Sequence, residues 1–232
     1  ENLGTPEQKV YTGTVGQLAA SRFESLSVLL VEAAQVPPRR TQGLPDEAFA
    51  RGKVPMTKQE VRAAVLAKLG VQPGELLWDV GAGTGSVSVE LALAAPRGRV
   101  YAVECDPEAC ALIRQNKEKF AVRNLTLVEG TAPAALENLP APDAVFIGGT
   151  KGNMAAVVEA ALARNPAARV CISAIALETL SAAVAALTAH GLQAEVCQIS
   201  VSRAKAAGKL HLLMANNPIF LITRADEAEK SV

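Results

Sequence analysis

The stretch Leu76-Leu77-Trp78-Asp79-Val80-Gly81-Ala82-Gly83-Thr84-Gly85-Ser86 decides how most of this chain folds. An apolar run typical of a β-strand contains an acid near its end, three alternating glycines follow, and Val87 and Leu91 then recur at helical spacing. Glycine is needed where the backbone takes positive φ or approaches a ligand closely, and a helix N-terminus presents unpaired N–H groups. The stretch therefore predicts a strand, a tight turn and a helix that bind a nucleotide-like ligand.

The spacing of the glycines selects among the known nucleotide loops. The dinucleotide pattern G-x-G-x-x-G needs a glycine where this chain has Ser86, and no lysine follows the glycines as a phosphate loop requires. The loop instead resembles the first motif of class I S-adenosylmethionine methyltransferases, Asp/Glu-x-Gly-x-Gly-x-Gly; a plain strand-to-helix turn is the alternative. The resemblance implies that the acid and the loop hold the amino acid part of this cofactor. The residues concerned are Asp79, Gly81, Ala82, Gly83, Thr84 and Gly85.

Composition narrows the class of protein. The 232 residues are 50% hydrophobic and 20% charged, which is typical of a folded protein with one sizeable core. Basic and acidic residues number 23 each, so the overall charge does not suggest binding to nucleic acid or anionic membrane. No apolar run reaches the roughly 18 residues of a membrane span, and no signal peptide is evident. The four cysteines lack metal-ligand spacing, so we expect buried free thiols in a reducing cytoplasm and no metal site.

Strand and helix patterns alternate after the glycine motif. Further strands are predicted at residues 99–104, 124–129, 142–147, 169–175, 192–201 and 219–223. Because these strands are apolar and separated by helical patterns, we predict an α/β fold with a doubly wound, mostly parallel, seven-stranded sheet, whose last two strands pair antiparallel. Before the motif, Thr57 and Glu60 have the form of a capping box for a helix that Gly70 ends.

The ends of the second and third strands carry further candidate binding residues. Glu104 comes roughly 20 residues after the glycine loop, where a carboxylate accepts ribose hydroxyls, and Asp106 then caps the next helix. Class I methyltransferases commonly have Gly-Asp-Ala after the third strand, with the Asp on adenine. This chain has Thr131 in its place, so we expect Thr131 and Ala132 to contact adenine through their backbone.

The chain divides into four regions by pattern and composition. Residues 1–35 predict two strands, at 9–13 and 26–31, around a short helix, which is too little to bury a core, so we interpret them as the end of an upstream domain. Residues 36–54 are rich in proline and polar residues and predict a linker, with Phe49 packed on the following domain. Residues 55–224 form the α/β domain, and the charged residues 225–232 form a loose tail.

Four motifs together resemble one family, the decarboxylating precorrin-6B methyltransferases of cobalamin biosynthesis. They are Pro55-Met56-Thr57-Lys58, the glycine loop itself, Phe146-Ile147-Gly148-Gly149 and Asn217-Pro218-Ile219-Phe220-Leu221-Ile222. The resemblance covers roughly residues 44 to 224. The opening of the chain resembles the end of a tetrapyrrole methyltransferase domain that methylates carbon 5 of the same ring system. The chain therefore resembles the second half of a bifunctional C5,15-methyltransferase.

This resemblance implies a reaction, a substrate and further site residues. The reaction is methylation of meso carbon 15, with loss of carbon dioxide from the acetate on carbon 12 in ring C. It implies cofactor contacts from Pro55, Thr57 and Gly148, and a homo-oligomer, namely a homotetramer. Because the substrate bears many carboxylates, cationic side chains near the carboxyl edge of the sheet are candidates to hold it. These candidates are Lys58, Lys151, Arg203, Lys205, Lys209 and His211, of which we assign Lys151, Arg203 and His211 to substrate binding and orientation.

Two alternatives remain open at this point. A class I methyltransferase acting on another small molecule, a protein or RNA would share the glycine loop, although the N-P-P-Y motif expected of base-amine methylases is absent after the fourth strand. A non-catalytic, cofactor-binding module of a fusion protein would share it too. The sequence also leaves open whether the substrate contains cobalt and which residue promotes decarboxylation.

Overall fold

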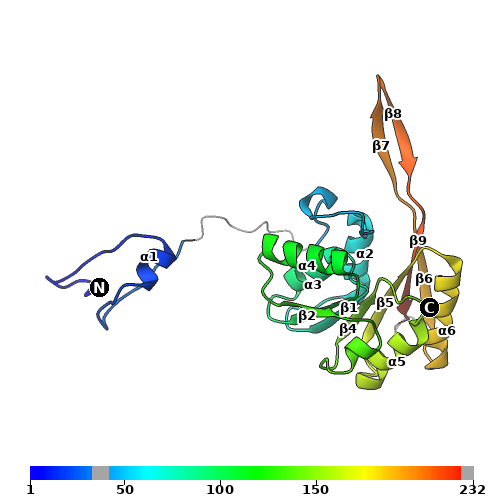
Figure 1. The fold of residues 1–232 in the computed structure, drawn as a ribbon, viewed down its shortest axis with the longest axis horizontal. Coiled ribbons are helices and arrows are strands. Elements are labelled where there is room, and N and C mark those ends of the chain that lie inside the picture. The colour runs from blue at the N-terminus through cyan, green and yellow to red at the C-terminus, as the bar shows by residue number, and fades with distance from the viewer. Residues whose placement is uncertain (33–41, 226–232) are drawn as a thin grey trace, which may run out of the picture. The chain divides into compact units, whose positions relative to one another are not determined.

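The computed structural model describes residues 1–32 and 42–225, in two units that divide between Pro38 and Arg39 (Figure 1). The first unit contains one short helix, α1 (Val15–Ala19), capped by the Thr14 hydroxyl, which accepts a hydrogen bond from the Gln17 N–H at 3.3 Å. The strands predicted at residues 9–13 and 26–31 are wrong, because the described part of this unit pairs no two segments as a ladder. Its apolar side chains are left exposed, Leu30 by 81%.

The second unit is built on one seven-stranded sheet, which confirms the predicted doubly wound fold. Its strands are β1 (Leu76–Val80), β2 (Arg99–Glu104), β3 (Leu125–Glu129), β4 (Ala144–Ile147), β5 (Arg169–Ala174), β6 (Ala194–Ile199) and β9 (Ile219–Arg224). Their order is β3-β2-β1-β4-β5-β9-β6. The first five strands run parallel, and β9 lies antiparallel between β5 and β6. The strand order reverses between β1 and β4, and open α/β sheets bind ligands outside the carboxyl ends of the strands at such a point.

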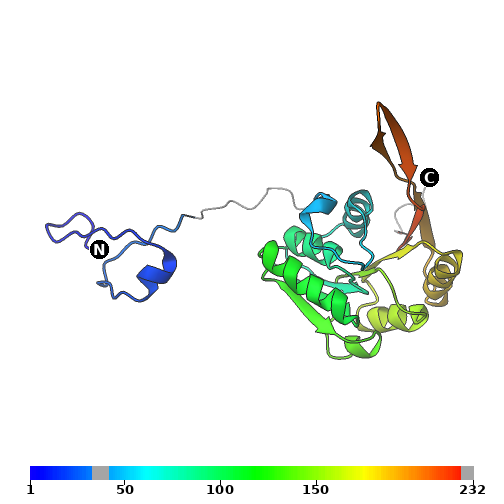
Figure 2. The ribbon, with the colours of Figure 1, turned by 45° about the horizontal axis from the view of Figure 1, so that its top comes forward.

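Helices cover both faces of the sheet (Figure 2). The bounds are α2 (Gln59–Leu69), α3 (Ser86–Ala94), α4 (Pro107–Lys119), α5 (Met154–Arg164) and α6 (Leu177–Ala189), with short 3₁₀ helices η1 (Asp46–Ala48) and η2 (Ala134–Leu136). Successive strand residues point to opposite faces. Leu77 therefore packs in the core with α2, α3 and α4, while Trp78 packs in the core with α5 and α6.

Helix boundaries test the predicted caps. Asp106 accepts a hydrogen bond from the Glu108 N–H at 2.8 Å and Gly70 is left-handed, so both of these predictions are confirmed. The capping box at Thr57 is wrong, because α2 begins at Gln59 and its N-cap residue, Lys58, makes no capping hydrogen bond; the Gln59 N–H instead donates to the Asp46 carboxylate at 2.9 Å. Glu60, the second member of that box, instead binds the guanidinium of Arg203.

Residues 42–54 were predicted as linker, but the structure packs them onto the α/β domain as a strap. Leu44 and Phe49 are buried, as expected for Phe49, and the buried Asn116 side chain bonds both the N–H and the carbonyl of Ala50 at 2.7 and 3.0 Å. The same Asn116 amide donates to the Thr84 carbonyl at 2.9 Å, so it joins the strap to the glycine loop. The α/β domain thus begins before residue 55. Two parts of the predicted regions lie outside the described residues, namely 36–41 of the predicted linker and 226–232 of the predicted tail.

A buried charge cluster holds the first part of the strap. Arg62 is fully buried and binds Asp46 at 2.8 Å and Glu90 at 2.7 Å. Glu90 also accepts the N–H groups of Gly43 at 2.7 Å and Leu44 at 3.1 Å. Buried charges are tolerated only when paired and hydrogen-bonded, so this cluster fixes where the strap lies.

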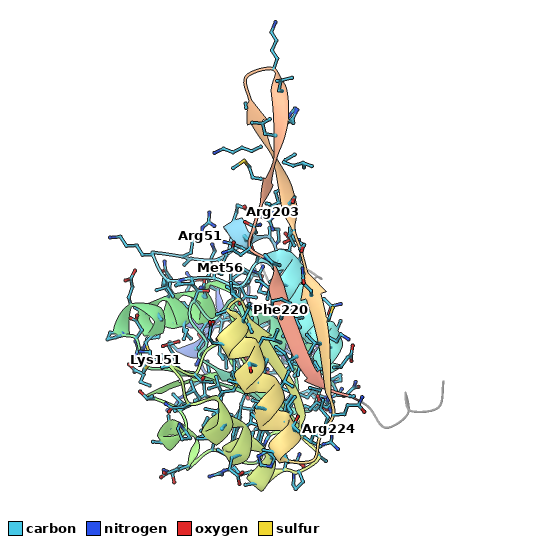
Figure 3. The ribbon with its side chains drawn as sticks, turned by 90° about the vertical axis from the view of Figure 1, so that its right-hand side faces the viewer. Arg51, Met56, Lys151, Arg203, Phe220 and Arg224 are labelled. Atoms are coloured by element: carbon cyan, nitrogen blue, oxygen red, sulfur yellow. The ribbon has the colours of Figure 1, made fainter. Side chains whose placement is uncertain are left out.

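A two-stranded hairpin between β6 and β9 was not predicted. It consists of β7 (Ser202–Ala207) and β8 (Leu210–Ala215), and we call residues 202–215 the arm. The arm projects away from the seven-stranded sheet (Figures 1 and 3), and all six residues of β8 are exposed. Within residues 1–32 and 42–225, no helix is long and apolar enough to cross a membrane.

Candidate active site

The loop after β1 touches the loop after β4, and at Gly81 only glycine fits this contact. Gly81, Gly83 and Gly85 have φ of 72°, 55° and 73°, a conformation that other residues rarely adopt. A Cβ on Gly81 would lie 2.3 Å from the carbonyl oxygen of Gly149, far inside van der Waals contact. The alternating glycines therefore bring two carboxyl ends of the sheet together.

Glu104, at the end of β2, fastens the glycine loop to the neighbouring strand. Its Oε2 accepts the Gly83 N–H at 2.9 Å, and its Oε1 accepts the N–H groups of Cys105 and Asp106 at 2.8 and 2.9 Å. A carboxylate oxygen accepts two hydrogen bonds, so Oε2 keeps one free position for a ligand hydroxyl. Glu104 is 9% exposed and faces the cavity described next.

A cavity of about 160 Å³ opens at this edge of the sheet. It is lined by Val80, Gly81, Val103, Glu104, Cys105, Gly130, Thr131, Ala132, Gly149, Thr150 and Lys151. Five of the sequence-predicted residues are therefore brought together: Gly81, Glu104, Thr131, Ala132 and Lys151. The other six lining residues were not among the predicted site residues, although each directly adjoins one of them in the sequence: Val80, Val103, Cys105, Gly130, Gly149 and Thr150.

The other predicted cofactor residues do not line the cavity. Those outside the lining are Pro55, Thr57, Asp79, Ala82, Gly83, Thr84, Gly85 and Gly148. The Pro55 carbonyl lies 3.2 Å from where a Cβ of Gly83 would be, and the Gly148 N–H donates to the Val80 carbonyl at 2.9 Å. Pro55 and Gly148 thus pack against the backbone of β1 and its loop rather than line the cavity.

Asp79 lies immediately behind the glycine loop and is fully buried. Its Oδ2 accepts a hydrogen bond from the Ser88 hydroxyl at the start of α3, whereas Oδ1 has no hydrogen-bond partner. Burial raises the pKa of this carboxyl from 3.8 to about 7; the Ser88 hydrogen bond lowers it and the nearby Glu104 charge raises it. The Thr84 hydroxyl in the same loop is also buried without a partner. Orphaned buried oxygens and a glycine cradle fit a polar, cationic ligand such as S-adenosylmethionine.

Lys151 follows β4 and is the cation that lines the cavity. It has a φ of 50°, which a non-glycine residue seldom adopts. A hydrogen bond with the Cys105 side chain raises the pKa of this amine, so Lys151 is cationic at neutral pH. It can hold an anionic group beside the cavity.

The remaining predicted cations do not line the cavity, and Figure 3 shows Arg203 well away from Lys151. Arg203, at the base of the arm, binds both oxygens of Glu60, at 2.9 and 2.7 Å, and lies 3.2 Å from Asp46. His211 is exposed on β8, Lys205 and Lys209 belong to the arm, and Lys58 precedes α2. The sequence placed them between strands of the sheet, but the unrecognised hairpin carries most of them away from it.

Comparisons with known proteins agree on one family. A family model described as a precorrin methyltransferase domain matches residues 47–224. A relative from Pyrobaculum calidifontis, named a probable cobalt-precorrin-6B C(15)-methyltransferase (decarboxylating), is 46% identical over 189 residues, covering 80% of this chain and 97% of the relative. A Sinorhizobium precorrin-6Y C(5,15)-methyltransferase is 41% identical over 165 residues, which cover 70% of this chain and 40% of that protein. The crystal structure of a precorrin-6y C5,15-methyltransferase from Geobacter metallireducens GS-15 matches with a TM-score of 0.76 and 40% identity, over 79% of this chain and 98% of that one.

Proposed function

Because the chain belongs to the precorrin methyltransferase family, we propose that it methylates carbon 15 of precorrin-6B, or of its cobalt form, and removes carbon dioxide from the ring C acetate, in cobalamin biosynthesis. The observation that carries the proposal is that the family match spans residues 47–224, which include the second part of the strap, the glycine loop and every residue lining the cavity. The protein is thus a decarboxylating C-methyltransferase.

The site residues supply positions for each part of S-adenosylmethionine, whose sulfonium provides the methyl group. We assign the ribose to the free position on Glu104 Oε2, the adenine to the backbone of Thr131 and Ala132, and the amino acid part to the glycine loop. Glu104 already holds the Gly83 N–H, so the loop is ordered before the ligand binds. Preorganised donors and acceptors of this kind lower the cost of binding.

The chemistry requires alignment more than an activated side chain. Methyl transfer from a sulfonium is an in-line displacement, and an electron-rich tetrapyrrole carbon is its own nucleophile, so correct placement contributes much of the rate enhancement. In decarboxylation, the electron pair of the broken carbon–carboxylate bond enters the conjugated ring, which is favoured when the carboxylate is withdrawn from water. The residues of this chain therefore act by binding, orienting and excluding water.

We expect Lys151 to hold a substrate carboxylate. Lys151→Gln keeps most of the side-chain length but removes the charge, so KM for the tetrapyrrole should rise about tenfold, the worth of one charge-assisted hydrogen bond. The Kd of S-adenosylmethionine, measured by calorimetry, should change less than about twofold. Lys119→Ala, on the exposed end of α4, is the matched control and should alter neither constant. An equal loss of both ligands in Lys151→Gln would assign this loop a structural role instead.

The homo-oligomer implied by the resemblance has a natural contact surface in the arm. Opposed residues on paired strands share a face, so one face of the arm, which lacks lysine, arginine and acidic residues, consists of Ser202, Ala204, Ala206, His211, Leu213 and Ala215. The other face carries the charged Arg203 and Lys205 beside Ala207, Leu210, Leu212 and Met214. An isolated two-stranded hairpin with exposed leucines is marginally stable in water and exposes free edges. We therefore propose a homotetramer in which the uncharged face of the arm meets a second copy.

Leu213→Asp tests this assembly, because a carboxylate on the uncharged face cannot be buried against another copy. We expect light scattering to give a tetramer for the unchanged protein and a smaller species for Leu213→Asp, with the melting temperature of the α/β domain little altered. Lys205→Ala, on the opposite face, should remain tetrameric. A Leu213→Asp protein of unchanged mass would exclude the arm as the contact.

Two further assignments accompany the proposal. Residues 1–35 would be the end of an upstream tetrapyrrole methyltransferase domain; this chain covers 40% of the Sinorhizobium relative, whose name gives two methylated positions, C(5,15). The reaction would take place in the reducing cytoplasm, consistent with the four free cysteines Cys105, Cys110, Cys171 and Cys197. Of these, Cys110 and Cys171 are buried as expected, whereas Cys105 and Cys197 are partly exposed.

The proposed activity is tested by transfer of a labelled methyl group. We expect label from S-adenosylmethionine to enter precorrin-6B or its cobalt form, and not protein or RNA. Label transferred only to another acceptor would support a different methyltransferase, and binding of the cofactor without transfer to any acceptor would support a non-catalytic module.

A further inference from the structure

The end of the strap carries a run of positive charge. Residues 51–58 contain Arg51, Lys53 and Lys58 and no acid, in a chain whose net charge is zero. Arg51 and Lys53 are exposed, and Lys58 is partly exposed. Within the part of the chain that the structure describes, none of these three charged groups takes part in a hydrogen bond or an ion pair. We call residues 51–58 the basic strip, because charge of one sign gathered in this way attracts a ligand of the opposite sign.

The fold holds the basic strip against the glycine loop. The Lys53 N–H donates to the carboxylate of Glu108, at the start of α4, at 3.4 Å. Two residues further on, the Pro55 carbonyl lies 3.2 Å from where a Cβ of Gly83 would be. The strip therefore runs from α4 across the loop to which we assign the amino acid part of the cofactor, and its cations stand on an anchored backbone.

Helix α2 places the end of the basic strip at the carboxyl end of β5. At the other end of α2, the Leu69 carbonyl accepts a hydrogen bond at 2.7 Å from Arg169, the first residue of β5. The helix packs against β4 and β5. Its 11 residues span about 16 Å and the 6 residues of β5 about 20 Å, so the two elements are matched in length. Lys58, directly before α2, therefore lies near the point where β5 ends and Ile175 follows.

An exposed apolar pair occupies this end of β5. Ile175 and Leu177 are 61% and 68% exposed, although both are large aliphatic side chains. The neighbouring strand β4 pairs parallel with β5, and the loop after it carries Lys151. The carboxyl edge of the sheet thus presents an apolar surface after β5, next to the cation that lines the cavity and to the end of the basic strip.

We propose that the tetrapyrrole substrate binds along this edge, with peripheral carboxylates on Arg51, Lys53 and Lys58. The face of its conjugated ring lies on Ile175 and Leu177. The methyl-accepting carbon is thereby brought beside the cofactor loop that the strip crosses. This inference rests on the proposed function and names the residues that select a flat substrate with many carboxylates.

The chemistry of the two features matches this class of ligand. Lysine and arginine donate charge-assisted hydrogen bonds to carboxylates, and a conjugated ring buries apolar area on aliphatic side chains. The acids closest to the strip are engaged elsewhere, because Glu108 accepts a backbone N–H and Glu60 binds Arg203. A cation at a helix N-terminus is unfavourable for the helix, so Lys58 does not serve the stability of α2. Single-stranded RNA, by contrast, is bound by stacking on aromatic side chains, which the apolar pair lacks.

Steady-state kinetics with precorrin-6B, or its cobalt form, test the basic strip. Arg51→Gln, Lys53→Gln and Lys58→Gln should each raise KM for the tetrapyrrole about threefold to fivefold, and the triple variant about fiftyfold. These contacts hold the substrate equally before and during the reaction, so kcat should change less than about twofold. The Kd of S-adenosylmethionine should also change less than about twofold. Arg99→Gln, an exposed cation at the amino end of β2, is the matched control and should alter none of these constants.

Salt dependence gives a readout that a purely structural role of the strip would not change. Exposed charges are screened by salt, so KM of the wild type should rise between low and physiological ionic strength. In the triple variant the rise should be much smaller, and Lys58→Arg should behave as the wild type because it keeps the charge.

Ile175→Ser tests the apolar surface. Because Ile175 is largely exposed, its loss should leave the melting temperature nearly unchanged but raise KM for the tetrapyrrole about fivefold. Val196→Ser, at an exposed aliphatic residue of β6, is the matched control and should leave KM unaltered. Light scattering on Ile175→Ser separates the two uses of an exposed apolar side chain. An unchanged mass with a raised KM supports the inference, whereas a smaller species with an unchanged KM would assign Ile175 to a contact between copies and overturn its role in binding substrate.

The outcomes distinguish this inference from the proposed function. A triple variant with the KM of the wild type, or one that loses tetrapyrrole and cofactor affinity equally, would overturn the inference and leave the proposed function standing. A wild-type protein that transfers no methyl group to either tetrapyrrole would overturn the proposed function itself.

Discussion

Gly81→Ala is expected to abolish cofactor binding and to destabilise the domain. The added Cβ would lie 2.3 Å from the oxygen and 2.7 Å from the nitrogen of Gly149, both backbone atoms of the adjoining loop. The φ of 72° at Gly81 adds strain for any residue with a Cβ. Because the cavity lies between these two loops, we expect a loss of at least about 3 kcal/mol of stability and at least about a hundredfold in the affinity for S-adenosylmethionine.

Gly149→Ala is the matched control for stability, since it lies on the other side of the same contact. A Cβ at Gly149 meets no atom within 4 Å, so the melting temperature of Gly149→Ala should be close to that of the wild type. Gly74→Ala, also in open space and remote from the cavity, is the control for binding. Cofactor affinity in Gly81→Ala within about threefold of wild type would contradict the role given to this loop.

Arg62→Met should produce the largest loss of stability away from the cavity. It removes the fully buried cation from a cluster in which Asp46 is 2% exposed and Glu90 fully buried, and it leaves Asp46 with the partly exposed Arg203 at 3.2 Å. Leaving partners of a buried ion pair uncompensated costs roughly 3–5 kcal/mol. For a domain of this size that corresponds to a fall of about 10 °C in melting temperature, measured by calorimetry. The strap should detach in the same variant, which hydrogen exchange at Leu44 and Ala50 would detect.

Arg114→Ala, which breaks the exposed ion pair between Arg114 and Glu129, is the control for Arg62→Met. Both side chains are more than half exposed, so Arg114→Ala should change the free energy of unfolding by less than about 1 kcal/mol. Combining Arg62→Met with Asp46→Asn and Glu90→Gln should recover part of the lost stability, because no buried charge is then left alone. A melting temperature unchanged in Arg62→Met would mean that the cluster does not hold the strap.

The sheet could be predicted because its signals are local. The periods of the apolar residues separate strands from helices, and the three glycines and the acid of β1 fix where the first strand meets its helix. The cavity was predicted in outline for the same reason, since parallel strands that end in Gly81, Glu104 and the loop of Lys151 must meet at one edge.

Other features depend on contacts between distant residues, which a single sequence does not display. The strap looks like a linker by composition, and only its partners Arg62, Glu90 and Asn116, 16 to 66 residues away, show that it packs. The arm resembles an irregular basic segment because its strands have alanine and leucine without a clear alternation. The predicted strands of residues 1–32 fail for the opposite reason, since they have strand composition but no neighbour to pair with among the described residues.

The most direct test of the account is the mass of the tetrapyrrole product. The chain is incubated with S-adenosylmethionine and precorrin-6B, or its cobalt form, and the product is analysed by mass spectrometry. The account predicts a product that has gained one methyl group and lost one carbon dioxide, and that is absent when Gly81→Ala replaces the wild type. A tetrapyrrole recovered without the added methyl group, from a protein shown by calorimetry to bind the cofactor, would contradict it.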